Sequence, residues 1–426
     1  MFSLGGTSST KLGARFHQVC ASVALSGLGD GMRFVALPLL AAQLTTDPRR
    51  IAAVSLAEQL PWLFLGLLSG ALADRFDRRR ILWLVDAVRT LIVGTLALAV
   101  AVQAATIPLL AAVAFLLGCG QTLYNGGWSG MVPALVDPSA LTRANARLQA
   151  GSLITDNLLG PTLGALLFGA AAALPFAVDT VSFAAAAALI LLLRGDFRPR
   201  LQAKPNPVTT LRRDTAEGVR WLWRHQLLRR LCLISGMTNF VGGALTSILV
   251  LYARGTLGLN NLGFALLLAS FALGGVAGAT ATPRLTARFG SPRILKLTAA
   301  GAAIASIGAG SATSAVAAGL FIAGYGAANL AWNVTAVSLR QSLVPAGLLG
   351  RVTMAYQMTT GGAGALGAVA AGFTARSFGL RAPFLAGAVL LFAASLISVR
   401  STTTSSLPTL VPTLDTPSRS GVGARR

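Results

Sequence analysis

Apolar stretches of helix length recur along the whole chain, and short charged segments separate them. A helix of ~20 apolar residues crosses a bilayer, because all of its backbone polar groups are satisfied within the segment. Only 11% of the residues are charged, against about 25% in a soluble domain, and the mean hydropathy is +0.69. The pattern predicts an all-α integral membrane protein with twelve transmembrane helices. The expected spans are 16–43, 51–73, 81–104, 108–134, 144–172, 175–194, 227–253, 261–283, 294–313, 315–340, 350–375 and 381–400.

The basic residues are distributed unevenly about these spans. With alternating crossings and a cytoplasmic N-terminus, most of the 35 Lys and Arg fall on the cytoplasmic side. The exceptions are Arg49, Arg50, Arg254, Arg376 and Arg381, expected outside, and Arg33 and Arg89, expected within spans. Membrane proteins carry such a basic excess on cytoplasmic loops. The net charge of +22 therefore indicates cytoplasmic termini and contact with anionic membrane lipids, and not a nucleic-acid partner.

The two halves of the chain resemble each other. Pro138 and Arg143 recur as Pro345 and Arg351, at corresponding places in the pattern of spans. Repeats related by an axis along the membrane normal are typical of transporters, whose substrate site lies near the midplane between them. We expect six-helix bundles over 1–194 and 227–400, a cytoplasmic linker with an amphipathic helix over 195–226, and a disordered cytoplasmic tail over 401–426.

A segment with six charges in seven residues, 74–80, lies between the second and third spans. Gly70-x-x-x-Asp74-Arg75-x-x-Arg78-Arg79 resembles the loop 2–3 motif of the major facilitator superfamily, with Asp77 in place of a second glycine. Gly160-Pro161-Thr162-Leu163-Gly164 resembles the antiporter motif of the same superfamily, with Asp156 in place of a small residue. Finer features, such as Gly29-Asp30-Gly31-Met32, resemble the branch that includes macrolide efflux pumps and the enterobactin exporter.

This resemblance implies the superfamily fold of two pseudo-symmetric six-helix bundles, in a bacterial inner membrane. It also implies that the loop residues latch the two bundles at the cytoplasmic rim. The residues expected to act in gating are Gly70, Asp74, Arg75, Arg78, Arg79, Gly160, Pro161 and Gly164. We predict that Asp74→Ala reduces transport and leaves substrate affinity nearly intact, and a large loss of binding would contradict this role.

Ionisable side chains within membrane spans are costly and mark functional sites by default. The first half contains all of those that lie away from helix ends. The candidates for proton coupling are Asp30, Arg33, Glu58 and Asp156. With a rise of ~1.5 Å per residue, Asp30 and Glu58 are expected at a common depth in the membrane.

Other roles for these charges stay open. Asp30 and Arg33 lie three residues apart on one helix, so they can simply neutralise each other. Asp86 and Arg89 repeat that spacing near a cytoplasmic helix end, where we expect only neutralisation. Asp179 falls in a span that is peripheral in the resembled family, so it is not among the candidates.

Two helix faces combine aromatic rings with amides at corresponding places in the two halves. They are Gln121, Tyr124, Asn125 and Trp128 in the fourth span, and Tyr325, Asn329, Trp332 and Asn333 in the tenth. The spacing places each set on one face of its helix. Such faces suit a bulky, largely apolar ligand, and packing between helices with amide hydrogen bonds is the alternative.

These features favour a secondary active transporter that exports a hydrophobic or amphiphilic small molecule by proton antiport and alternating access. We expect a monomer whose partners are its substrate, protons and membrane lipids, with neither cofactor nor metal. A proton-coupled uptake symporter for a metabolite is an alternative, and a non-transporting receptor or scaffold is another. We do not expect an enzyme, because Lys11, Lys204 and Lys296 follow no phosphate-binding glycines. The same observation excludes an ATP-driven pump, unless a separate subunit supplies the ATPase.

Overall fold

The computed structural model describes residues 13–73, 77–128, 131–136, 140–193, 207–345 and 348–400, and they are almost entirely helical. The helices of the first half are α1 (Ala14–Leu44), α2 (Pro48–Ala73), α3 (Arg78–Ala101), α4 (Ile107–Trp128), α5 (Met131–Leu135), α6 (Leu141–Ile154), the π-helical turn η2 (Thr155–Leu159), α7 (Gly160–Ala170) and α8 (Leu174–Leu191). Helix α9 (Pro207–Arg224) follows. The second half contains α10 (Gln226–Leu251), the π-helical turn η3 (Tyr252–Thr256), α11 (Asn261–Phe289), α12 (Ser291–Ser311), α13 (Ala315–Leu343), α14 (Leu349–Phe378) and α15 (Ala382–Arg400).

Polar residues and glycines set the ends of several helices. The side chains of Asp77, Asn260 and Ser314 accept backbone N–H groups of the first turns of α3, α11 and α13, which otherwise lack partners. Gly290 and Gly379 follow the C-termini of α11 and α14 with φ of +79° and +87°, a conformation that costs glycine little. These residues allow the chain to reverse direction in short loops.

The loop between α1 and α2 holds a local ion pair. Asp47 directly precedes α2, and its carboxylate accepts hydrogen bonds from the guanidinium and the backbone N–H of Arg49. The hydrogen bond from the Arg49 side chain is the main reason that the pKa of Asp47 is lowered to about 2. Asp47 is therefore ionised at any pH at which the protein is expected to work.

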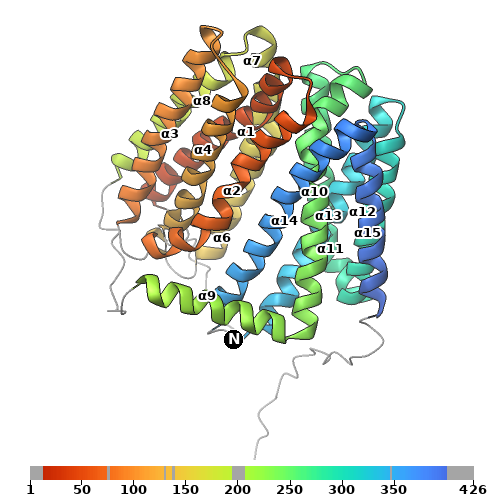
Figure 1. Ribbon diagram of the computed structural model, residues 1–426. Coiled ribbons are helices and arrows are strands. Elements are labelled where there is room, and N and C mark those ends of the chain that lie inside the picture. The colour runs from red at the N-terminus through yellow and green to blue at the C-terminus, as the bar shows by residue number, and fades with distance from the viewer. Residues whose placement is uncertain are drawn as a thin grey trace, which may run out of the picture.

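The helices form two groups that use the same pairings (Figure 1). In the first group α1 packs against α7 and α8, α2 against α4, and α3 against α4 and α8. In the second group α10 packs against α14 and α15, α11 against α13, and α12 against α13 and α15. Between the groups, α2 packs against α14 and α7 against α11, which is again one pairing used twice. The two halves therefore share one architecture, with their interface formed by equivalent helices.

Nine of the expected twelve spans are found by length and composition within the described residues. They are α1, α3, α4, the run from α6 to α7, α8, the run from α10 to η3, α11, α12 and α13. Helices α2 and α14 have 26 and 30 residues but include charged or Thr- and Gly-rich turns. The apolar part of α15 is the shorter stretch Ala382–Leu396. The molecule is thus an all-helical multi-pass membrane protein.

Helix α9 lies in the linker, where an amphipathic helix is expected, and crosses one end of the molecule (Figure 1). It packs against α14 and, less extensively, against α10 and α2. Leu222 is buried in the apolar core of the second group, and Arg351 at the start of α14 forms an ion pair of 2.6 Å with Glu217. The helix is therefore attached mainly to the second half. The predicted tail, 401–426, lies outside the described residues.

Candidate functional site

Arg33 is at the centre of a cluster of charged side chains inside the first group of helices. Its guanidinium lies 2.5 Å from Asp30 on the same helix, 3.5 Å from Glu58 on α2 and 3.5 Å from Asp179 on α8. The Arg33 side chain is 9% exposed and that of Asp179 is fully buried, whereas the Glu58 side chain is 38% exposed. One buried cation thus holds three carboxylates from three helices, and one of the three reaches open space.

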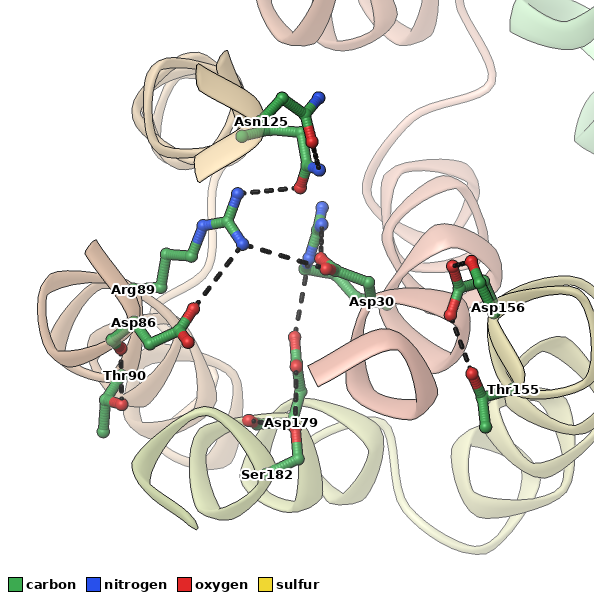
Figure 2. Close-up of polar contacts among 12 residues, drawn as sticks. Asp30, Asp86, Arg89, Thr90, Asn125, Thr155, Asp156, Asp179 and Ser182 are labelled. Atoms are coloured by element: carbon green, nitrogen blue, oxygen red, sulfur yellow. Dashed lines mark hydrogen bonds and ion pairs between the residues drawn. The ribbon is translucent and has the colours of Figure 1, made fainter. Parts of the chain in front are cut away.

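A second arginine extends this cluster towards α3 and α4. The Arg89 guanidinium lies 3.9 Å from Asp30 and 3.8 Å from Asp86, and it donates a 2.7 Å hydrogen bond to the Gln121 amide oxygen. Asp86 is fully buried, and neither of its carboxylate oxygens accepts a hydrogen bond from a described residue. Figure 2 shows the Arg89 guanidinium between Asp86 and Asp30, with dashed lines to both carboxylates. We call these six residues, Asp30, Arg33, Glu58, Asp86, Arg89 and Asp179, the charge network.

Gly29 on α1 allows Asp179 of α8 to lie close to α1. A Cβ at Gly29 would overlap the Asp179 carboxylate and the Ser182 hydroxyl of α8. The Ser182 hydroxyl also lies within 3.3 Å of the Asp179 carboxylate, from the same helix face. The glycine therefore allows the one acidic turn of α8 to lie directly against α1, where Arg33 neutralises it.

The network borders a cavity of about 470 Å³ between the two groups of helices. Arg33 and Glu58 form part of its wall, and the second half contributes only uncharged side chains to it, among them Asn239, Phe271 and Tyr325. This volume is in the range of sites for drug-sized ligands, ~300–1,000 Å³. The cavity therefore combines a broad apolar and aromatic wall with charges on one side only.

The predicted residues of the fourth span lie close to the network. Gln121 accepts from Arg89 and donates to the exposed Asn125 at 3.2 Å. Tyr124 is buried, with the Arg89 guanidinium 5.3 Å from its ring centre. The structure describes the backbone of Trp128 at the end of α4 but not its side chain. Gln121 and Tyr124 therefore contact the Arg89 guanidinium and fix its position. That this set of residues contacts the substrate stays a prediction.

The predicted residues of the tenth span are divided between two environments. Tyr325 and Asn329 line the cavity, and Asn333 is exposed. Trp332 lies instead in the apolar core of the second group, where its indole N–H donates to the Ser235 hydroxyl at 2.8 Å. The structure thus brings Tyr325 and Asn329 to one cavity with Arg33 and Glu58, and it places Trp332 elsewhere.

The position of Trp332 leads to a test by substitution. Tyr356 also donates to the Ser235 hydroxyl, at 2.5 Å, so Ser235→Ala leaves the buried Trp332 N–H without an acceptor and leaves the Tyr356 hydroxyl with only the longer contact of 3.5 Å to the Leu231 carbonyl. Each such donor costs about 1–3 kcal/mol. We expect a clearly lower unfolding temperature and unchanged substrate affinity, measured by thermal denaturation and ligand binding. Ser338→Ala, at an exposed serine of α13, is the control and should change neither quantity.

Asp156 lies apart from the charge network. Its carboxylate accepts from the hydroxyls of Ser152 at 2.5 Å and Thr155 at 2.9 Å, and it forms no ion pair with a described residue. Figure 2 shows it beside Thr155, away from Arg89 and Asp179. It belongs to the π-helical turn η2, which directly precedes Gly160 and Pro161. A proline lacks the N–H donor that a regular helix needs, so the irregular turn has a local cause.

Glycines also bring α1 and α7 into close contact. A Cβ at Gly164 would lie 2.5 Å from the carbonyl oxygen and 2.7 Å from the Cα of Met32. We expect Gly164→Ala to push the helices apart, at a cost of about 1–3 kcal/mol, and to reduce transport. Gly151→Ala on α6 is the control, because nothing lies within 4 Å of its added methyl group, and it should preserve or raise stability. Equal unfolding temperatures for the two variants would contradict this packing.

The residues of the charged loop are only partly described. Asp74 and Arg75 lie outside the described residues, and Gly70 lies within α2. Arg78 and Arg79 begin α3, and the Arg79 guanidinium donates to the backbone carbonyls of Ile190 and Leu191 at the end of α8. Arg79 therefore binds carbonyl groups at the C-terminus of α8. The latch between the two halves remains a prediction.

Sequence reasoning missed three members of the network: Asp86, Arg89 and Asp179. The spacing of Asp86 and Arg89 indicated only mutual neutralisation, because a helix pattern does not reveal which neighbours a side chain meets. A signal for Asp179 was present, since it is the single charge of an otherwise apolar span and such residues are functional candidates by default. Within the described residues, no group of three or more His, Cys, Asp or Glu side chains could hold a metal ion.

The sequence is similar to those of known membrane transporters. The model of a family described as transmembrane secretion effector matches residues 13–413. The multidrug efflux pump Tap of Mycobacterium tuberculosis is 27% identical over 395 residues, which cover 88% of this chain and 90% of that protein. The uncharacterized MFS-type transporter YfiS of Bacillus subtilis is 26% identical over 391 residues, which cover 89% of this chain and 91% of that protein.

The fold is also found among solved structures. The crystal structure of the nucleoside transporter NupG aligns with a TM-score of 0.74 at 14% identity, over 92% of this chain and 100% of that chain. At this identity the likeness concerns the fold alone. It is the fold of the major facilitator superfamily, with two related groups of helices around a central cavity.

Proposed function

Since the chain belongs to the transmembrane secretion effector family of the major facilitator superfamily, we propose that this secondary transporter is a proton antiporter. It exports a hydrophobic or amphiphilic small molecule by alternating access. The charge network takes up and releases the proton, and the cavity between the two halves binds the substrate. The similarity to the efflux pump Tap, at 27% identity, supports the outward direction of transport.

The proposed topology has twelve spans. Helices α2, α14 and α15 add to the nine spans found by composition, and both termini are cytoplasmic in a bacterial inner membrane. The repeated pairings support this count, because α2 and α14 occupy positions equivalent to those of α11 and of the run from α6 to α7. A monomer suffices, since both halves of the cavity come from one chain.

One observation supports the coupling mechanism above all others: Arg33 and Glu58 belong to the charge network and to the cavity wall. Such a group interacts with both the proton and the ligand. Binding of the proton therefore changes the affinity for the ligand, and binding of the ligand changes the affinity for the proton. The network contains four carboxylates but only two guanidinium groups. Two carboxylates therefore have no cation of their own, and transported protons neutralise them. Asp156, which lies apart from the arginines, is not needed for this cycle.

The size and lining of the cavity support a largely apolar substrate. Aromatic side chains supply contact area, and a few amides supply oriented hydrogen bonds. Alternating access then requires the two halves to tilt about the contacts of α2 with α14 and of α7 with α11. Gly160, Pro161 and Gly164 are proposed to allow that movement, because they set the contact of α7 with α1.

Export is tested in two steps. A susceptibility panel on cells with and without this chain first identifies compounds that it transports. Uptake of the best compound into everted membrane vesicles is then measured with and without a proton gradient. We expect uptake that stops when the gradient is collapsed. Gradient-independent uptake would contradict antiport, and accumulation in intact cells in place of export would favour the symporter.

A further inference from the structure

A second, smaller cavity of about 140 Å³ adjoins the central one. Both cavities share the side chains of Phe34, Thr246, Leu268, Phe271 and Tyr325, so they adjoin along a common wall, and we call them the central part and the smaller part. The smaller part extends between η2 and α7 of the first half and α10, α11 and α13 of the second. Its volume suits one arm of a ligand, with the rest in the central cavity.

The charges around the two parts differ. Arg33 and Glu58 line the central part, whereas Asp156 is the one ionisable carboxylate of the smaller part and no Arg or Lys is among its described lining residues. No Asp or Glu occurs in the sequence between Glu217 and Asp415. An acidic partner for a ligand in this space therefore has to come from the first half, from Glu58 or from Asp156.

Of these two acids, Asp156 is the better partner for a cation. Glu58 already lies 3.5 Å from the Arg33 guanidinium, which would repel a second cation placed beside it. Asp156 forms no ion pair with a described residue, and the hydrogen bonds from Ser152 and Thr155 use only part of the acceptor capacity of a carboxylate, about four lone pairs. Asp156 lines the smaller part, whose described lining contains no competing positive charge.

The aromatic rings of the smaller part favour the same kind of ligand. Phe34, Phe271, Tyr325 and Phe384 line it, and the face of an aromatic ring attracts a cation. The Tyr325 hydroxyl is buried and has no hydrogen-bond partner among the described residues, at the wall that both parts share. An uncompensated buried hydroxyl costs free energy, so a ligand atom that accepts from it adds affinity.

We propose that the smaller cavity is a subsite for the cationic arm of the substrate, an organic ammonium group that pairs with Asp156. This inference rests on the proposed function and specifies its substrate as an amphiphilic cation. Asp156 is then a binding and specificity-determining residue, and the proton is carried by the separate charge network.

Equilibrium binding to the purified full-length protein tests this assignment without any proton gradient. The probes are benzyltrimethylammonium, a permanent cation, and phenylmethanesulfonate, an anion of similar size, measured by titration calorimetry. We expect the wild type to bind the cation at least tenfold more tightly than the anion. Asp156→Asn should weaken cation binding about tenfold and remove the preference, and Asp156→Glu should restore most of it.

Two control variants separate Asp156 from its surroundings. Ser152→Ala removes one hydroxyl partner but leaves the carboxylate, so it should keep the cation preference. Glu58→Gln removes the acid of the central part and should weaken cation binding less than Asp156→Asn does. Loss of preference in Glu58→Gln but not in Asp156→Asn would overturn the assignment, as would a wild type without preference. Monodisperse elution and an unchanged unfolding temperature show that each variant is folded.

Failure of this inference can be distinguished from failure of antiport. If wild-type cation binding depends on Asp156 but no gradient-driven export occurs, the subsite stands and the antiport proposal fails. If export is gradient-driven while Asp156→Asn binds the cation normally, antiport stands and the subsite is wrong. If Asp156→Asn binds normally but loses coupling to the proton gradient, Asp156 is a coupling residue and the subsite is equally wrong.

Discussion

Replacement of Arg33 by glutamine is expected to abolish export and to lower the yield of folded protein severely. Arg33 lies within 3.5 Å of Asp30, Glu58 and Asp179, and Asp179 is fully buried. Removal of one partner from a buried ion pair costs about 3–5 kcal/mol, because it leaves an uncompensated charge. The free energy of unfolding of a typical protein is only about 5–15 kcal/mol, so this loss is a large part of its stability.

A second substitution distinguishes lost charge balance from lost packing. The double variant Arg33→Gln with Asp179→Asn removes one positive and one negative charge, and it should recover most of the folded protein but not the transport. Arg50→Gln, at an exposed arginine of α2, is the control and should change neither. The measurements are the monodisperse yield and the unfolding temperature. A stable single variant, or a double variant no better than the single one, would contradict the central position of Arg33.

Asp30→Asn is expected to uncouple the transporter while leaving it folded. Asp30 lies 2.5 Å from Arg33 and 3.9 Å from Arg89, so it links the two arginines of the network. An amide has nearly the same shape as a carboxylic acid but can neither bind nor release a proton at this place. In proteoliposomes we expect at least a tenfold loss of gradient-driven transport, with exchange of substrate across the membrane retained.

The control for Asp30→Asn is Asp47→Asn. Asp47 also pairs with an arginine, but it lies in the loop between α1 and α2 and is not part of the network. Its substitution should leave gradient-driven transport near the wild-type level. Equal losses in both variants would indicate a general effect of removing an acid, and full coupling in Asp30→Asn would exclude Asp30 as a proton carrier.

Much of the architecture follows from the sequence, because hydrophobic length is a strong constraint in a membrane. Nine described helical segments are long and apolar enough to cross a membrane. The motifs repeated in the two halves also predict that the helices α1 to α8 and α10 to α15 pack in the same pairs. Asp30 and Glu58, which we expect at a common depth in the membrane, both contact Arg33 in the structure. Their depth in the membrane stays a prediction.

The composition of the site could be predicted less well. Periodicity along one helix predicts which residues share a face, but it does not identify the helix that the face meets. Asp179 therefore escaped prediction, although Gly29 on α1 leaves room for it. In the same way Trp332 shares a face with Asn329 by spacing, yet Ser235 on α10 binds it within the core. The positions of Asp179 and Trp332 both depend on contacts with segments that are distant in the sequence.

Proton release on substrate binding tests the central claim most directly. The purified protein, in weakly buffered detergent solution with a pH-sensitive dye, is mixed with the best compound from the susceptibility panel. We predict that the wild type releases protons on binding and that Asp30→Asn binds the compound but releases measurably fewer. Binding without proton release by the wild type, or the same release from Asp30→Asn, would contradict a charge network that couples protons to export.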